Sequence, residues 1–243
     1  MAILTGPSSR LLRHWFRLGV LVLGAAGAGH AALPDYVRAA LSRFNPELPA
    51  GWAYTTTTVR GDVSTTERYD PAKAPEEQWT LLRFNGRPPL PADLEKYRKL
   101  RAANPSPASQ ATFTRADIEP GSLQLLHEDA ERAEFAGAFR EAAAGADKML
   151  RHLRLRLTVN KRQPHVEKFA LDLLAPYTPI LGVKMNELAV TMSFTPPTPD
   201  RPSLPAASTS HFAGRIFFIG TEEDLRVTYA DFAPARPQPP RGE

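Results

Sequence analysis

Cysteine is absent from all 243 residues of this chain. Without it the protein cannot form structural disulfides, present a thiol nucleophile or bind a metal through thiolates. The chain also offers no cysteine for lipid attachment at a cleavage site. We therefore expect a mature protein that is soluble rather than tethered to a membrane.

A long apolar run is also missing. The run over residues 18–28 is about half the roughly 20 residues that a helix needs to span a bilayer. Three arginines between residues 10 and 17 precede it, and Gly29-His30-Ala31 follows it with small residues at both ends. This order predicts a signal peptide over residues 1–31, cleaved near Ala31, with a retained membrane anchor as the less favoured alternative. Together with the lack of disulfides and the Ala-, Arg- and Pro-rich composition, it favours a bacterial periplasmic location.

Neither sign of charge dominates once the predicted signal peptide is set aside. The sequence holds 30 basic and 26 acidic side chains, and the signal peptide contributes three of the basic ones, which leaves 27 against 26. A nearly neutral chain argues against nucleic-acid binding, which needs a concentrated basic surface. About 212 residues, 243 less 31, remain after cleavage. We expect them to form a single domain over residues 32–234, followed by a Pro-rich flexible tail over residues 235–243.

The first part of the mature chain combines helices and strands. Residues Pro34–Phe44 place apolar side chains at helical spacing, and a second helix begins at Pro91 with acidic residues near its start and basic residues near its end. Between them, β-branched and aromatic residues predict three strands, over Trp52–Thr58, Val63–Tyr69 and Gln78–Phe84.

From about Ser122 to Phe232 the sequence alternates between apolar and polar residues, as strands of an antiparallel sheet do. The clearest strand is His152–Val159. Arg215–Ile219 is apolar on both faces and is expected at the centre of the sheet or beneath a helix, and Pro196–Ser210 is expected to be a long mobile loop. The predicted fold is α+β: a large curled antiparallel sheet, a half-open β-barrel, with two or three short helices covering its concave face.

Motifs for catalysis or metal binding are scarce. His127-Glu128 begins like a zinc protease signature, but the second histidine is missing. There is no Gly-x-Ser-x-Gly elbow and no glycine-rich phosphate loop. We therefore expect a protein without enzymatic activity, metal or cofactor. A hydrolase of envelope polymers with a scattered active site is the third alternative.

Two surfaces are candidate binding sites. A basic face around Arg154 and Arg156 fits anionic lipid headgroups or an acidic partner, although a solvated sheet face is the favoured interpretation because Glu167 and Asp172 lie nearby. The second surface is the apolar concave face, which either packs against the helices or leaves a hollow for a lipid or acyl chain. Its expected lining is Trp79, Leu155, Leu157, Phe169, Leu171, Val190, Met192, Phe194 and Phe218.

The order of a signal peptide, a short helix, a few strands, a covering helix and a long antiparallel meander resembles the LolA/LolB-like superfamily of periplasmic lipoprotein carriers. The segments Glu67–Pro71, Pro179–Leu188 and Arg215–Phe218 are also similar to uncharacterised exported proteins of proteobacteria. The likeness to the carriers is architectural, so no functional residue is transferred. It implies a half-open barrel that shields acyl chains, which is an analogy from fold to function.

The leading hypothesis is a periplasmic, non-enzymatic binding or carrier protein for an apolar ligand, a lipid or a lipoprotein acyl chain. It depends on the sheet offering more apolar surface than two short helices can cover. The alternative is an envelope scaffold or interaction protein with a filled core, which holds a protein partner by its sheet edge or basic face.

Overall fold

The strands of the protein join into one antiparallel sheet. The computed structural model describes residues 32–103, 113–141 and 149–235, and the predicted signal peptide lies outside these ranges. The described residues belong to a compact unit that begins at Ala32. Most of the predicted tail also lies outside them, but the backbone N–H of Ala235 donates to the carbonyl of Gly51 at 2.8 Å.

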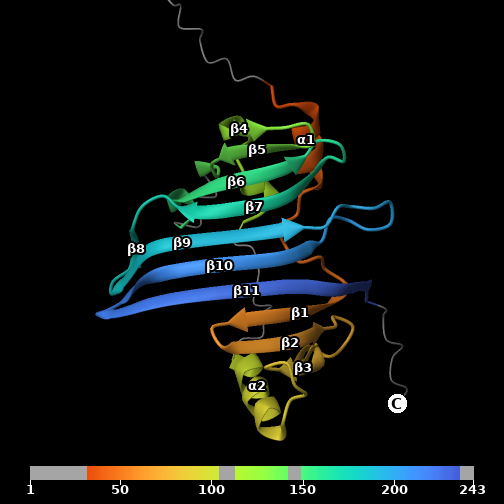
Figure 1. The fold of residues 1–243 in the computed structure, drawn as a ribbon, viewed down its shortest axis with the longest axis vertical. Helices are drawn as coiled ribbons and strands as arrows, with labels where there is room; N and C mark the ends of the chain where they lie inside the picture. The colour runs from red at the N-terminus through yellow and green to blue at the C-terminus, as the bar shows by residue number, and fades with distance from the viewer. Residues whose placement is uncertain (1–31, 104–112, 142–148, 236–243) are drawn as a thin grey trace, which may run out of the picture. The chain divides into compact units, whose positions relative to one another are not determined.

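The sheet has 11 strands in the order β3-β2-β1-β11-β10-β9-β7-β6-β5-β4, with β8 paired to β9, and it is not closed (Figure 1). Its edges are therefore β3 and β4. The strands are β1 (Trp52–Arg60), β2 (Val63–Tyr69), β3 (Trp79–Phe84), β4 (Gln124–Glu128), β5 (Arg132–Gly137), β6 (Leu153–Asn160), β7 (His165–Leu173), β8 (Tyr177–Ile180), β9 (Val183–Phe194), β10 (Pro205–Ile216) and β11 (Ile219–Pro234). The predicted α+β class with a large curled antiparallel sheet is confirmed.

The pairing of β1 with β11 joins the two ends of the domain. Thr56 lies opposite Tyr229 in this antiparallel ladder, and Trp52 lies opposite Pro234. The three N-terminal strands thereby extend a sheet whose remaining strands all come from the second half of the chain. This long-range pairing makes one continuous apolar face out of two separate segments of sequence.

Alternation of side chains along the strands produces that face. Leu153, Leu155, Leu157 and Val159 of β6 are all buried, whereas Arg154 between them is exposed. The predicted strand over His152–Val159 is therefore confirmed, with the boundary shifted by one residue at each end. Since successive residues of a strand point to opposite faces, this pattern buries one face and leaves the other in water.

The helix α1 (Asp35–Arg43) covers the apolar face over β6 and β7. It buries Val37, Ala40 and Leu41, and Phe44 follows it directly into the core. The Phe44 ring meets Phe194 edge-on, with centroids 5.6 Å apart. Apolar residues from the connections fill the remainder of this region: Phe113, Ile118, Phe139 and Leu150.

The helix α2 (Pro91–Ala103) packs at the opposite end of the sheet, against β3. Its anchor is Arg101, whose Nη2 lies 2.7 Å from Oε2 of Glu67. The Arg101 guanidinium also stacks over the Trp79 ring at 4.1 Å from the centroid. Short 3-10 helices occur in the connections, at η1 (Pro75–Glu77), η2 (Arg115–Asp117), η3 (Pro120–Ser122) and η4 (Leu150–His152).

Two sequence predictions about the last strands are wrong. The segment Arg215–Ile219 is neither buried in the middle of the sheet nor covered by a helix, because it forms the exposed tip of the β10–β11 hairpin, where Phe218 is 92% exposed. The predicted loop over Pro196–Ser210 is shorter than expected, because β10 begins at Pro205. Proline is tolerated there because it stands at the first position of the strand.

Within the part of the chain that the structure describes, neither helix combines the length and the apolarity needed to cross a membrane.

Candidate functional site

The predicted apolar lining is mostly core. Six of the nine residues are at most 6% exposed, and Val190 and Trp79 are partly buried against the same cluster. The six are Leu155, Leu157, Phe169, Leu171, Met192 and Phe194. Their side chains pack against one another and against α1, so most of this face meets protein rather than an open hollow.

Phe218 does not line this face, which corrects its place in the predicted site. It lies in a turn beside the turn between β8 and β9, and the backbone N–H of Phe217 donates to the carbonyl of Gly182 at 2.5 Å. The Phe217 ring packs so closely on Gly182 that a Cβ there would lie 2.8 Å from it. Together these turns present an apolar tip to solvent, made of Ile180, Leu181, Ile216, Phe217, Phe218 and Ile219.

The predicted basic face carries paired charges. Nη2 of Arg156 lies 2.9 Å from Oδ2 of Asp172, and Nη1 lies 3.6 Å from Oε1 of Glu134. Arg154 stands opposite Asp172 in the β6–β7 register. These acidic neighbours neutralise the face, as expected for a solvated sheet surface.

A cavity on the apolar side lies at the end of α1, and we call it the α1 pocket. Its volume is about 580 Å³, within the range of roughly 300–1,000 Å³ typical of small-molecule sites. Three segments of sequence contribute its walls: the C-terminal end of α1, the start of β7, and the loop between β9 and β10. The lining residues are Ala40, Arg43, Phe44, Asn45, His165, Val166, Phe194 and residues 197–203.

Hydrogen bonds fix the loop wall of the α1 pocket. Thr198 and Arg201 exchange backbone hydrogen bonds of 2.8 and 3.2 Å across a tight turn. The backbone N–H of Thr195 donates to the carbonyl of Leu204 at 2.8 Å, and the Ser203 hydroxyl donates to the carbonyl of Thr195 at the same distance. Leu204 is fully buried. The loop is therefore a built wall rather than a free segment.

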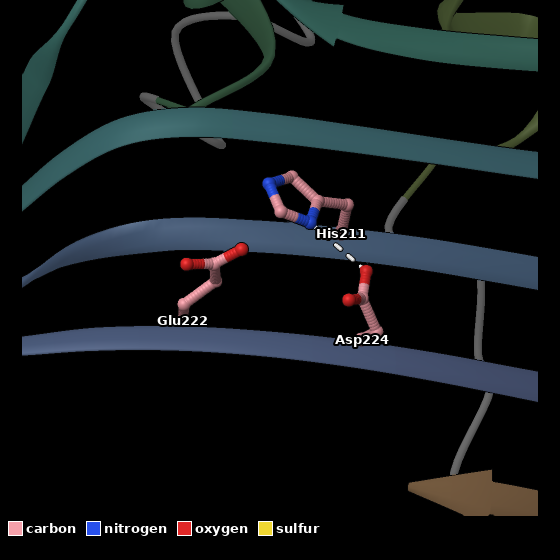
Figure 2. A group of neighbouring side chains, drawn as sticks. All are labelled: His211, Glu222 and Asp224. Atoms are coloured by element: carbon pink, nitrogen blue, oxygen red, sulfur yellow. Dashed lines mark hydrogen bonds and ion pairs between the residues drawn. The ribbon is translucent and has the colours of Figure 1, made fainter. Parts of the chain in front are cut away.

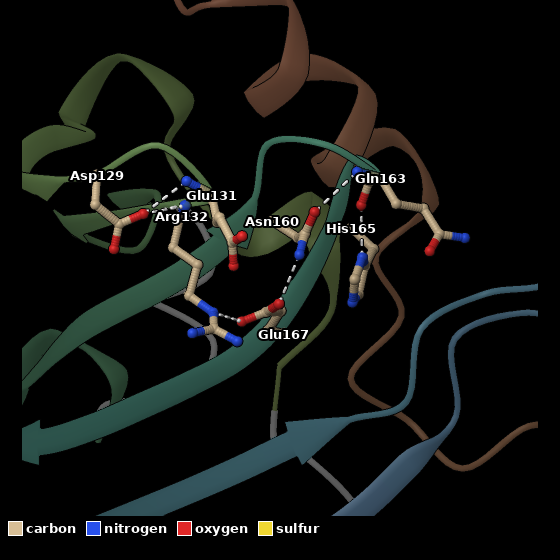
Figure 3. Close-up of polar contacts among 7 residues, drawn as sticks. All are labelled: Asp129, Glu131, Arg132, Asn160, Gln163, His165 and Glu167. Atoms are coloured by element: carbon tan, nitrogen blue, oxygen red, sulfur yellow. Dashed lines mark hydrogen bonds and ion pairs between the residues drawn. The ribbon is translucent and has the colours of Figure 1, made fainter.

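The turn between β6 and β7, shown in Figure 3, positions the part of the lining next to this loop. Oδ1 of Asn160 accepts from the backbone N–H of Gln163, and Nδ2 of Asn160 donates to Glu167, both at 2.8 Å. Nε of Arg132 donates to the other oxygen of Glu167 at 2.6 Å. Burial raises the pKa of Glu167, but the hydrogen bonds from Asn160 and Arg132 outweigh it and leave the pKa below its usual value.

This turn positions His165, which is 3% exposed. Nδ1 of His165 lies 2.6 Å from the carbonyl oxygen of Gln163, and Figure 3 shows the second ring nitrogen turned away from that carbonyl. Nε2 is buried and has no hydrogen-bond partner among the described residues. The same holds for Nε of Arg201, which also lines the pocket. Buried polar atoms normally have partners, so these two mark an unused bonding capacity in the pocket wall.

A second polar cluster lies on the other face of the sheet, where His211, Glu222 and Asp224 converge (Figure 2). Their potential ligand atoms all lie within 4.8 Å of one another. One imidazole and two carboxylates can bind a divalent ion. However, Nδ1 of His211 already bonds Oδ1 of Asp224 at 2.9 Å. The Asp224 side chain is 78% exposed, so water can reach its carboxylate and no ion is needed to satisfy it.

Sequence reasoning missed the polar half of the α1 pocket. It placed His165 in a turn and gave it no role, and it did not single out Arg43 or Arg201. No spacing rule joins positions 43, 165 and 201, because the fold alone brings them to one cavity. The Pro-rich composition of the β9–β10 loop was the one local signal, and it was interpreted as mobility.

A scan against protein-family models found no match, and searches of curated proteins and of solved structures found no significant match either. The function therefore has to be argued from the geometry of the site.

Proposed function

We propose that the protein is a non-enzymatic binding or carrier protein that takes a small ligand with an apolar body into the α1 pocket. In this proposal the chain is exported, and the mature protein, which begins near Ala32, works in the periplasm. The observation that carries the proposal is the cavity of about 580 Å³ at the end of α1. Such a volume accommodates a short acyl chain or a compact lipid fragment better than a whole lipoprotein anchor.

The apolar floor of the pocket supports this ligand class. Phe44 and Phe194 are each 6% exposed, and Val166 is 2% exposed, yet all three line the cavity together with Ala40. Burying apolar ligand surface against such a floor contributes about 25 cal/mol per Å² before the cost of binding. The predicted lining residue Phe194 thus belongs to the site, although most of the predicted lining is packed core.

Uptake of a fluorescent acyl probe by the purified mature protein tests the proposal. Asn45 is exposed and lines the pocket, so Asn45→Trp should fill the opening without disturbing the core. We expect this variant to lose the probe, whereas Lys168→Trp, on an exposed position of β7, should bind it as the parent does. Equal binding by both variants would place the ligand elsewhere, and absence of binding by the parent protein would end the proposal.

The apolar tip favours a second candidate, an interaction protein that holds a protein partner. Phe217 and Phe218 are 71% and 92% exposed, and a contiguous exposed apolar surface commonly marks an interaction site. A photo-crosslinking residue at position 218 should then form one discrete adduct in cells, and the same residue at position 168 should form none. A diffuse ladder from both positions would contradict this candidate.

A further inference from the structure

The two walls of the α1 pocket differ in chemistry. One wall is apolar and is built from Phe44, Phe194 and Val166. The other is polar and carries side chains from three separate segments of the chain, Arg43 at the end of α1, His165 at the start of β7 and Arg201 in the β9–β10 loop. A pocket divided in this way fits an amphiphile, with its tail on the first wall and its polar end on the second.

The charge of the polar wall determines which charge the polar end of the ligand should carry. Two guanidinium groups line the pocket, Arg43 and Arg201, and arginine stays protonated at all physiological pH values. Asp200 is the one carboxylate that lines it, and it is exposed. The charged groups that line the pocket therefore sum to a net positive charge.

The two buried nitrogen atoms without a hydrogen-bond partner among the described residues also favour a ligand with a negatively charged polar end. Nε of Arg201 carries an N–H that is buried and unpartnered, and only an acceptor can satisfy it. Nδ1 of His165 is engaged by the carbonyl of Gln163, which leaves Nε2 as the free ring atom. Nε2 pairs with a carboxylate when the ring is protonated and with a carboxylic acid O–H when it is neutral. A carboxyl group offers a partner of the right kind to each atom, whereas an ammonium group offers only donors and an alkane offers neither donor nor acceptor.

The position of His165 is prepared before any ligand arrives. The side chain of Asn160 holds the turn through Gln163, and Glu167 anchors that asparagine from β7 (Figure 3). Gln163 also donates from Nε2 to the carbonyl of Pro197 at 2.6 Å, which ties this turn to the loop that carries Arg201. The turn that carries His165 and the loop that carries Arg201 are therefore tied together by hydrogen bonds, the preorganisation that a specific site requires.

We propose that the α1 pocket selects amphiphiles whose polar end is an oxyanion, with a fatty carboxylate as the class that fits best. Arg201 and His165 hold the oxyanion, Arg43 adds positive charge at the opening, and the tail lies on Phe44 and Phe194. This inference rests on the proposed function, because it assigns the ligand class of the same pocket.

A matched series of ligands tests it. Dodecanoate, dodecyl phosphate, dodecanol and dodecylamine share a tail and differ in the polar end, and calorimetry or displacement of a fluorescent acyl probe gives the dissociation constant of each. We expect dodecanoate to bind about tenfold more tightly than dodecanol, the difference expected for one charge-assisted hydrogen bond. Dodecyl phosphate distinguishes a phosphate headgroup from a carboxylate as the preferred oxyanion, and its binding more tightly than dodecanoate would replace the carboxylate assignment.

Variants of the pocket residues distinguish the oxyanion inference from the proposed function on which it rests. Arg201→Gln should weaken dodecanoate about tenfold and leave dodecanol within about twofold. Phe44→Leu should weaken both ligands alike, and Arg154→Gln, on the other face of the sheet, should change neither. If His165→Gln folds less well than the parent, Arg201→Gln alone carries the test. Equal affinity for dodecanoate and dodecanol would overturn the oxyanion inference and leave the proposed function standing, whereas no binding of any member would end both.

Discussion

Replacing Glu67 tests what holds α2 on the sheet. Glu67 and Arg101 form an ion pair of 2.7 Å whose side chains are only 9% and 16% exposed. Arg101 also stacks on Trp79 and donates from Nε to the hydroxyl of Tyr97 at 3.4 Å. Burial lowers the pKa of Arg101, and the pair with Glu67 raises it above its usual value. Because a guanidinium is effectively always protonated in proteins, Arg101 stays charged when Glu67 is removed.

The expected loss in the free energy of unfolding follows from the burial of the Glu67–Arg101 pair. Glu67→Leu leaves a buried, uncompensated positive charge, and removing one partner of such a pair costs about 3–5 kcal/mol. Arg101 can escape this cost only if α2 leaves β3, so the free energy of undocking α2 sets an upper limit. Since Leu90 and Leu100 of this region are more than half exposed, that limit is low, and we expect about 3 kcal/mol.

Urea unfolding followed by circular dichroism and tryptophan emission measures the effect. A second variant, Glu67→Leu with Arg101→Leu, replaces both charges with apolar groups, and its stability should return to within about 1 kcal/mol of the parent because well-packed apolar replacements of buried pairs are often neutral. A loss below about 1 kcal/mol in Glu67→Leu, or no recovery in the double variant, would refute the reasoning.

Three further predictions concern other parts of the chain. The hydrogen bond to Asp224 is the main cause that raises the pKa of His211, so an NMR titration should give a pKa above 6.5, and Asp224→Asn should lower it. The contact between His211 and Asp224 stabilises the fold fully below pH 6.5, and this contribution is lost as the pH rises through the pKa of the folded state. Leu157 is fully buried, so Leu157→Ala should lower the free energy of unfolding by about 2–5 kcal/mol, measured with urea, whereas a smaller loss would mean that the core repacks. Mass spectrometry of protein exported by a Gram-negative host should find a chain that starts near Ala32, and an intact residue 1 would contradict the signal peptide.

Strand periodicity carried most of the fold prediction. Along β6, residues 153, 155, 157 and 159 had to share a face, and apolar residues on one face of an antiparallel strand are driven into the core. The same reasoning predicted both helices, because α1 and α2 have apolar residues at helical spacing and end signals at both termini. These are local properties, and short-range chemistry determines them.

The same logic failed at Arg215–Ile219, where an apolar run marks an exposed turn. Phe217 has a positive φ of 54°, a conformation that depends on the neighbouring turn through Gly182 rather than on the local sequence. Hydrophobicity alone does not tell a central strand from an apolar tip. The sequence did not predict the pocket for a related reason, since positions 43, 165 and 201 meet only after the sheet has formed.

The pairing of β1 with β11 has a consequence for how the domain is made. β1 ends 159 residues before β11 begins, from Arg60 to Ile219. Among the described strands, β1, β2 and β3 pair with the rest of the sheet only through β11. The ladder between β1 and β11 therefore cannot assemble until Ile219–Pro234 has been synthesised, and such non-local pairing slows folding. Loss of the final dozen residues of β11 would remove every residue that pairs with β1, so the three N-terminal strands would lose their ladder to the rest of the sheet.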